Sequence, residues 1–211
     1  MSARAAGHRG QKVTTDRESD QLLVERVQAG ERQAFDLLVS KYQRRLLRLV
    51  GRIVHDPAEA EDVVQETFIK AFRALRHFRG DSAFYTWLYR IGINTAKNTL
   101  VTQNRRTPST LADARAPEAL AEDDALRDIN TPESMLATRQ IAETVNAAMD
   151  ALPVDLRTAI LLREIEGLSY EEISDIMSCP IGTVRSRIFR AREVIAEKLR
   201  PLLDVPVDKR W

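Results

Sequence analysis

The chain has 211 residues, enough for one or two domains, and its single cysteine excludes an intrachain disulfide and fits a reducing compartment. Lys and Arg number 32 against 31 Asp and Glu, so the net charge of +1 identifies no class of partner. No apolar run reaches the ~18 residues that a membrane-spanning helix needs. We therefore expect a cytoplasmic protein.

The N-terminal segment carries no sign of export. Its first 18 residues are small, polar and basic, with no hydrophobic stretch after the charges. This pattern excludes a secretory signal and predicts a disordered tail over residues 1–18.

Apolar residues at spacings of three and four predict an all-α first domain over residues 19–104. The helical pattern begins near Asp20, is interrupted at Gly30 and ends before Pro57. A second helix runs from about residue 58 to 75. Its apolar stripe consists of Val64, Phe68, Ala71, Phe72 and Leu75. A loop over residues 79–82 then precedes an aromatic-rich helix at about 83–100.

Composition changes at Arg105. The next residues contain three prolines and few large apolar side chains, and seven acids stand against two arginines between Ser109 and Ala137. Such a segment buries too little surface to offset the entropy of ordering, which predicts a flexible acidic linker over residues 105–137. Its length is unusual inside a compact domain and indicates two domains.

The second domain, over residues 138–203, has the pattern of a helix-turn-helix, and residues 204–211 form a C-terminal tail. Gly167 is placed to end one helix, and Ser169 and Glu172 form a capping box that opens a short one. A turn at residues 178–180 leads into a basic helix that we expect to reach Leu199. These proportions are typical of a DNA-binding helix-turn-helix.

The last helix divides into two faces. Val184, Ile188, Ala191 and Ile195 lie on one stripe, which must pack on the rest of the domain. The candidates for DNA contact are Thr183, Arg185, Ser186, Phe189 and Arg190, and the last four of these lie on the other half of the helix. Arginine can form two hydrogen bonds with guanine, serine can hydrogen-bond with several bases, and phenylalanine can contact a thymine methyl group. Thr183, Arg187 and Arg192 flank this face and are placed for phosphates.

Five aromatic residues stand between Phe78 and Arg90, within a stretch from Lys70 to Arg106 that has eight Lys and Arg and one acid. Rings that stack on bases and cations that follow phosphates are what single-stranded nucleic acid binding requires. Helical spacing turns Phe84, Trp87 and Leu88 inward. The remaining candidates for nucleic acid contact are Phe78, Tyr85, Tyr89, Arg90 and Asn94.

Asp62, Gln65 and Glu66 lie on a polar face near the start of the preceding helix. By their chemistry alone these residues are ordinary solvated side chains at a helix start.

Three segments together resemble one family. Residues 62–68 look like the polymerase-binding motif of bacterial sigma factors, residues 78–97 like their promoter-melting and −10 region, and residues 168–193 like their −35 recognition motif. The match is to the extracytoplasmic-function group, in its sigma-E-like, envelope-stress branch. The resemblance implies two helical domains and an initiation factor that binds core RNA polymerase.

The resemblance also implies roles for single residues. Asp62, Gln65 and Glu66 then dock on the largest polymerase subunit, and the loop near Phe78 and the helix with Asn94 capture an extruded base of the non-template strand at −10. The last helix then contacts duplex promoter DNA at −35. The family further implies an anti-sigma partner, often anchored in the membrane.

Two other functions are compatible with parts of the sequence. A stand-alone helix-turn-helix regulator would bind duplex DNA without polymerase, but it usually carries a sensing or dimerising domain, which residues 78–94 do not resemble. An enzyme is disfavoured because the three histidines are scattered, and neither metal-ligand spacing nor a glycine-rich phosphate loop occurs. We therefore expect no catalytic site, metal or cofactor.

Overall fold

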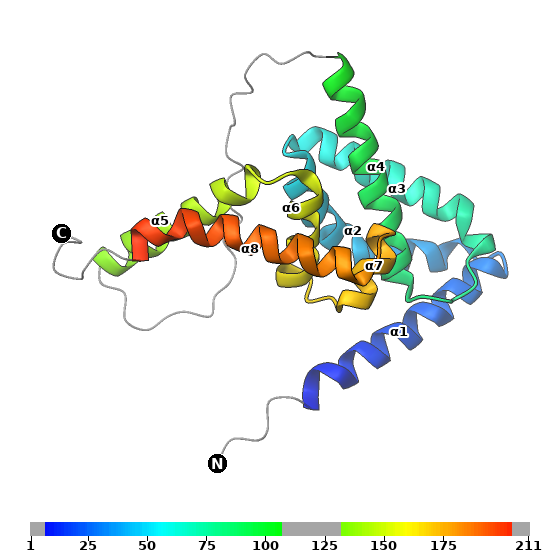
Figure 1. The fold of residues 1–211 in the computed structure, drawn as a ribbon. Helices are drawn as coiled ribbons and strands as arrows, with labels where there is room; N and C mark the ends of the chain where they lie inside the picture. The colour runs from blue at the N-terminus through cyan, green and yellow to red at the C-terminus, as the bar shows by residue number, and fades with distance from the viewer. Residues whose placement is uncertain (1–6, 107–131, 204–211) are drawn as a thin grey trace. The chain divides into compact units, whose positions relative to one another are not determined.

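The computed structural model describes residues 7–106 and 132–203, and within these ranges the protein is helical and contains no strand (Figure 1). The chain divides into two compact units, and the main division along the sequence falls at residue 108. Among the described helices none is long and apolar enough to cross a membrane. The expected all-α fold with two helical units is confirmed.

Within its described residues, the first unit contains four α-helices and one short 3-10 helix. Helix α2 packs against α3 and α4, α3 packs against α4, and α1 lies along α2. The bounds are α1 (Gly7–Gln28), α2 (Arg32–Val54), α3 (Pro57–Ala74), η1 (Leu75–His77) and α4 (Phe84–Arg106).

Local chemistry sets the helix boundaries that position the candidate residues. The Asp56 carboxylate accepts from the backbone N–H of Glu59 at 3.0 Å and so caps α3. Pro57 occupies the first turn of α3, where the missing N–H has no partner in any case. Gly92 lets α4 approach α2, because a Cβ there would lie 2.9 Å from Leu46 Cδ1.

The N-terminal segment differs from the disordered tail that we expected over residues 1–18. Residues 7–18 are helical, and only residues 1–6 lie outside the described part of that segment. The physical reason is that extending a helix already formed adds one hydrogen bond for each residue fixed, whereas starting one is unfavourable. An apolar stripe is therefore not required at this end of α1.

The second unit consists of α5 (Pro132–Asp150), α6 (Val154–Ile160), a π-helical turn η2 (Leu161–Ile165), α7 (Tyr170–Met177) and α8 (Ile181–Leu203). Helix α8 packs against α5 and α6. The buried side chains of Leu152, Ile160 and Ala191 form a core here, against which Val194 and Ile195 pack. Helix α8 therefore packs on this unit through residues of the apolar stripe that its sequence predicts.

The boundaries around this unit differ from the expected ones. Residues 105–106 belong to α4 and residues 132–137 to α5, so the helices extend into both ends of the expected linker. Residues 107–131 of that linker and the expected tail at 204–211 lie outside the described residues. Helix α8 continues four residues past the expected end, to Leu203.

The capping box at the start of α7 forms as expected. The Ser169 hydroxyl accepts from the backbone N–H of Glu172 at 3.2 Å, and the Glu172 carboxylate accepts from the N–H of Ser169 at 2.8 Å. Gly167 adopts a φ of +70°, a conformation that favours glycine and ends the preceding helical segment. These two features fix the turn from which α7 and then α8 emerge.

Candidate nucleic-acid interface

Helix α8 has one buried and one exposed face. Val184, Ile188 and Ala191 are 0%, 2% and 0% exposed, and they anchor the helix. Arg185, Ser186 and Arg190 are exposed on the opposite side, and Phe189 is 62% exposed. Fully burying a phenylalanine is worth about 1.5–3 kcal/mol, and the fold gains little of this from the Phe189 ring.

The exposed face of α8 retains free hydrogen-bonding capacity. The Ser186 hydroxyl donates to the Thr183 carbonyl at 2.9 Å, which leaves the lone pairs of its oxygen for a donor on a base. The Arg185 guanidinium lies 5.5 Å from the centre of the Tyr170 ring. Thr183 is half-buried at the start of the helix.

The two flanking arginines, which we expected to contact phosphates, are each paired with an acid. Arg187 donates to the Asp155 carboxylate at 2.7 Å and to Cys179 Sγ at 3.3 Å. Arg192 is paired with Glu164 at 2.5 Å. Both acids lie outside α8, so their proximity could not be inferred from the sequence of that helix. The arginines that remain exposed on the central face are Arg185 and Arg190.

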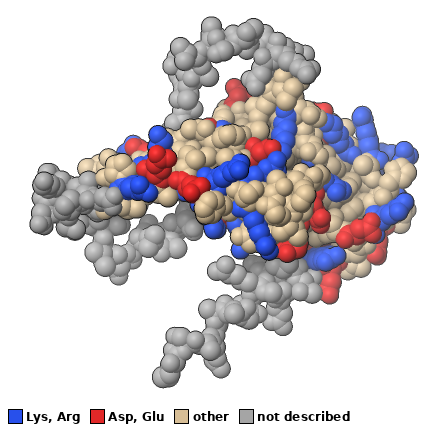
Figure 2. Space-filling view, viewed as in Figure 1, with Lys and Arg blue, Asp and Glu red and all other residues tan. Residues whose placement is uncertain are grey.

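The surface of the protein carries charges of both signs, as Figure 2 shows for one side of the molecule. On α8, Arg187 and Arg192 are paired with acids, whereas Arg185 and Arg190 bring positive charge to the exposed face.

In the first unit, Phe78 belongs to an aromatic cluster made by the loop and by the start of α4. Its ring centre lies 5.0 Å from that of Trp87 and 6.3 Å from that of Phe84. Phe84 and Leu88 are 3% and 0% exposed, as expected. Trp87, which we expected to face inward, is only half-buried. The loop residue and α4 together present a partly exposed pair of rings.

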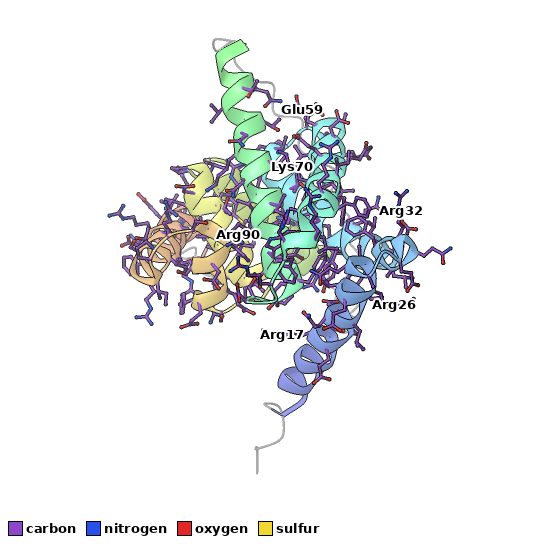
Figure 3. All side chains as sticks on the ribbon, turned by 90° about the vertical axis from the view of Figure 1, so that its right-hand side faces the viewer. Arg17, Arg26, Arg32, Glu59, Lys70 and Arg90 are labelled. Carbon is purple, nitrogen blue, oxygen red and sulfur yellow. The ribbon has the colours of Figure 1, made fainter. Side chains whose placement is uncertain are left out.

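The candidate residues on α4 do not share one face. Asn94 is exposed and Arg90 is half-buried, and the four-residue spacing places them on one side of the helix. Trp87, seven residues before Asn94, shares that side. Tyr85 is nine residues from Asn94, about two and a half turns, and therefore points the opposite way. Figure 3 labels Arg90 on this helix.

The structure corrects the expectation for Tyr89. Its side chain is 0% exposed, and its ring lies 6.2 Å from that of Tyr85. Thr86 and Ile93, three residues before it and four after it, are also buried and share its helix face. The sequence interpretation kept Phe78, Tyr85 and Tyr89 as the ring candidates and turned Trp87 inward, although the seven-residue spacing of Trp87 from Asn94 was an available signal.

Asp62, Gln65 and Glu66 are exposed on α3. The Glu66 carboxylate pairs with Lys70 at 2.8 Å, and Lys70 Nζ also donates to Thr95 Oγ1 of α4 at 3.2 Å. Figure 3 shows Lys70 beside α4. Asp62, Glu66 and Lys70 line a groove together with residues of α4, Asn98 and Thr102 among them.

Two apolar residues on α3 were not recognised from the sequence as exposed. Ile69 is 51% exposed, and Phe72, which we expected on the buried stripe, is 41% exposed although its ring contacts Phe35 at 5.0 Å. Gln65, Ile69 and Phe72 are spaced by four and three residues and share a face. Exposed apolar side chains in a row beside acids are typical of a protein-binding surface.

Comparison with known proteins identifies the family. The family model for sigma-70 region 2 matches residues 38–106, and the model for sigma-70 region 4 matches residues 142–195. Over 186 residues the chain is 60% identical to the RNA polymerase sigma-H factor of Pseudomonas aeruginosa, which covers 88% of this chain and 96% of that protein. It is 56% identical over 185 residues to the ECF RNA polymerase sigma-E factor of Escherichia coli K12, covering 88% and 96%.

The chain belongs to the extracytoplasmic function (ECF) sigma factors.

Membership makes this sigma factor a non-enzymatic initiation factor that binds RNA polymerase and recognises promoters. The solved structure of the sigma factor RpoE of Bartonella quintana, in complex with the anti-sigma factor NepR, is similar to it with a TM-score of 0.61 and 25% identity. That likeness covers 79% of this chain and 96% of the other. The region 2 match includes α3 and α4, whereas α1 precedes it.

Proposed function

We propose that this sigma factor directs RNA polymerase to promoters of a stress regulon, envelope stress in particular, through three separate surfaces. The observation that carries the proposal is the exposed Phe189 between exposed Arg185 and Arg190, opposite a fully buried stripe. A solvated helix face has no need of such a ring.

The first surface is the exposed face of α8, which we assign to the −35 element. Arg185 and Arg190 bond guanine through two atoms, Ser186 bonds a base edge, and Phe189 contacts a thymine methyl group in the major groove. Thr183, at the start of α8, contacts a phosphate and fixes the position of the helix on the duplex.

The second surface is formed by Phe78, Arg90 and Asn94 and acts at the −10 element. The exposed Asn94 amide bonds the edge of a base that has left the stack, and the half-buried ring of Phe78 packs against the base. Arg90, on the same side of α4 as Asn94, contacts the strand backbone. Tyr85 points away from this side and Tyr89 is buried, so neither belongs to the proposed surface.

The third surface is on α3, where Asp62, Gln65 and Glu66 dock on the largest subunit of core polymerase. Ile69, exposed beside them, adds apolar area to this contact. Because the factor acts on polymerase and promoter DNA, we infer that it works in the cytoplasm.

An anti-sigma factor is the inferred partner of the inactive state. The similarity to a sigma factor that was solved in complex with an anti-sigma factor supports this inference. Such a partner, which is often anchored in the membrane, would cover the docking surface on α3 and so exclude polymerase.

Run-off transcription with core polymerase on a sigma-E-type promoter tests the proposal. The factor should produce a transcript of defined length, and Arg190→Ala should weaken promoter binding by about 1–3 kcal/mol, because it removes a contact to a base edge. Lys198→Ala is the matched control, since it removes an exposed cation two turns further along α8.

The result also separates the sigma factor from a stand-alone helix-turn-helix regulator. A regulator would bind the promoter duplex alone and leave core polymerase unable to initiate. No transcript together with tight, specific binding of the duplex in the absence of polymerase would favour the regulator.

A further inference from the structure

Gln28, the last residue of α1, connects that helix to the start of the −10 loop, residues 78–83. Its Nε2 atom donates to the Leu75 carbonyl at 3.0 Å and to the Phe78 carbonyl at 2.9 Å. A side-chain amide nitrogen carries two hydrogens, so these two bonds use both of its donors. The contacts join residues 47 and 50 positions apart in the chain.

The two carbonyls that Gln28 binds lie where the helical backbone ends. Carbonyl groups at the end of a helix have no partner within it. Leu75 begins the short η1 helix, and its carbonyl also accepts from the N–H of Phe78 at 3.0 Å. Gln28 therefore acts as a cap supplied by another helix, and it fixes the backbone on both sides of the turn that leads to Phe78.

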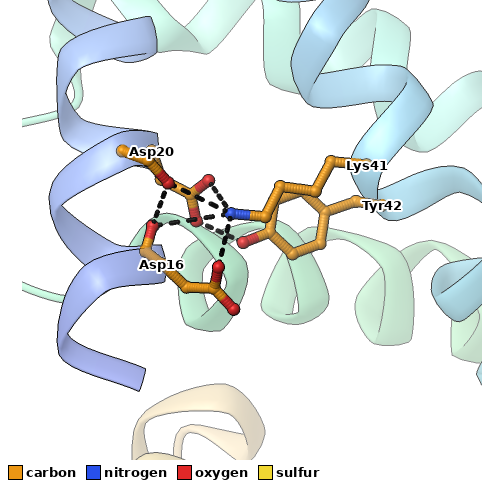
Figure 4. Close-up of polar contacts among 5 residues, drawn as sticks. Asp16, Asp20, Lys41 and Tyr42 are labelled. Atoms are coloured by element: carbon orange, nitrogen blue, oxygen red, sulfur yellow. Dashed lines mark hydrogen bonds and ion pairs between the residues drawn. The ribbon is translucent and has the colours of Figure 1, made fainter. Parts of the chain in front are cut away.

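Helix α1 is itself held firmly, so Gln28 is attached to a fixed support. The Asp20 carboxylate is 1% exposed and is bound by Lys41 and Tyr42 of α2 (Figure 4). The next residue, Gln21, lies against the loop, because a Cβ on Gly80 would be 3.4 Å from Gln21 Oε1.

We propose that Gln28 is a positioning residue for base capture at the −10 element. By fixing the Phe78 carbonyl it holds the Phe78 ring against Trp87, in the place where the ring meets an extruded base. Ordering the loop before DNA binds reduces the entropy lost on binding. This inference rests on the proposed role of Phe78 and Asn94, and it assigns a function in promoter opening to α1, which precedes the region 2 match.

Gln28→Met tests the inference, because methionine has a similar shape but cannot donate. Losing two neutral hydrogen bonds should slow open-complex formation by about 5- to 10-fold on a promoter with the intact −10 element. Gln28→Glu should be worse, since a carboxylate repels the two carbonyl oxygens. Gln43→Met is the matched control, because it makes the same substitution at an exposed glutamine of α2.

The decisive readout is discrimination, measured as the ratio of opening rates on the intact promoter and on one with the captured −10 base replaced. Gln28→Met should lower this ratio and leave both binding to core polymerase and the thermal midpoint within the range of Gln43→Met. A Gln28→Met ratio equal to that of the unmodified factor, or equal losses on both promoters, would overturn the inference.

Asn94→Ala, measured in the same assay, separates this inference from the proposed function. If Asn94→Ala lowers discrimination and Gln28→Met does not, the positioning role alone is wrong. If Asn94→Ala also leaves discrimination unchanged, the assignment of the −10 surface itself is wrong.

Discussion

The hydroxyl group of Tyr42 on α2 donates a hydrogen bond to the carboxylate of Asp20 on α1, and the two side chains are 2% and 1% exposed (Figure 4). Lys41 Nζ binds the other carboxylate oxygen at 2.6 Å. A buried carboxylate is tolerated only where it is paired and hydrogen-bonded. The position of α1 on α2 is therefore fixed by polar contacts as well as by the apolar side chain of Val24.

Replacing Tyr42 by phenylalanine removes the hydroxyl and leaves Asp20 with one partner fewer. We expect the free energy of unfolding to fall by about 1–3 kcal/mol, the penalty for a buried acceptor that loses its donor. Urea denaturation followed by circular dichroism measures the change. Tyr170→Phe, in the second unit, is the control for loss of a half-buried tyrosine hydroxyl, and an equal midpoint for both variants would contradict the prediction.

The same pair predicts how stability depends on alkaline pH. Burial raises the pKa of Tyr42, and the hydrogen bond to Asp20 raises this pKa further. The unfolded chain releases the phenolic proton near pH 10 while the folded chain retains it, so this contribution is present below about pH 10 and is lost as the pH rises further. The stability difference between the unmodified protein and Tyr42→Phe should therefore be constant below about pH 10 and shrink as the pH rises above this value, and a difference that stays constant above pH 10 would refute the assignment.

The capping box of α7 gives a prediction for the second unit. Ser169→Ala removes the acceptor for the N–H of Glu172 and should lower stability by about 0.5–2 kcal/mol. Ser169→Thr retains a hydroxyl and should recover most of that loss. Thermal unfolding of the three proteins checks both statements, and an alanine variant as stable as the threonine variant would show that the cap contributes nothing.

Local signals allowed much of the structure to be predicted. The capping box, the glycine after η2 and the stripe of Val184, Ile188 and Ala191 each depend on residues within about one to two helical turns of one another. Such features are visible in sequence because the interacting groups are neighbours in the chain. The faces of α8 were predictable for the same reason.

What the sequence did not reveal depends on contacts between distant segments. Asp20 and Tyr42 belong to different helices, as do Gln28 and Phe78, and no periodicity links them. Tyr89 was misjudged because buried residues occupy more than one side of α4, whereas the interpretation assumed a single inward stripe. The Arg187 side chain is paired with Asp155, which lies 32 positions away in the chain.

The docking surface on α3 predicts a specific loss of polymerase binding. Gln65→Ala with Glu66→Ala should weaken pull-down of core polymerase, while the stability changes by less than about 0.5 kcal/mol because both side chains are exposed. The matched control is Gln33→Ala with Asp36→Ala, which removes an exposed amide and an exposed acid from α2. Equal recovery of polymerase by the two double variants would refute the assignment of α3.

Asn94→Ala separates strand opening from duplex binding. Its proposed ligand exists only after a base has left the stack, and extrusion costs a few kcal/mol that the Asn94 amide helps to offset. Holoenzyme with this variant should bind the promoter duplex normally and open it poorly, as permanganate footprinting would report. A template already unpaired over the −10 region should partly restore transcription, because the unpairing no longer has to be driven by the protein. Equal permanganate reactivity with the variant and the unmodified factor would remove the reason for assigning melting to α4.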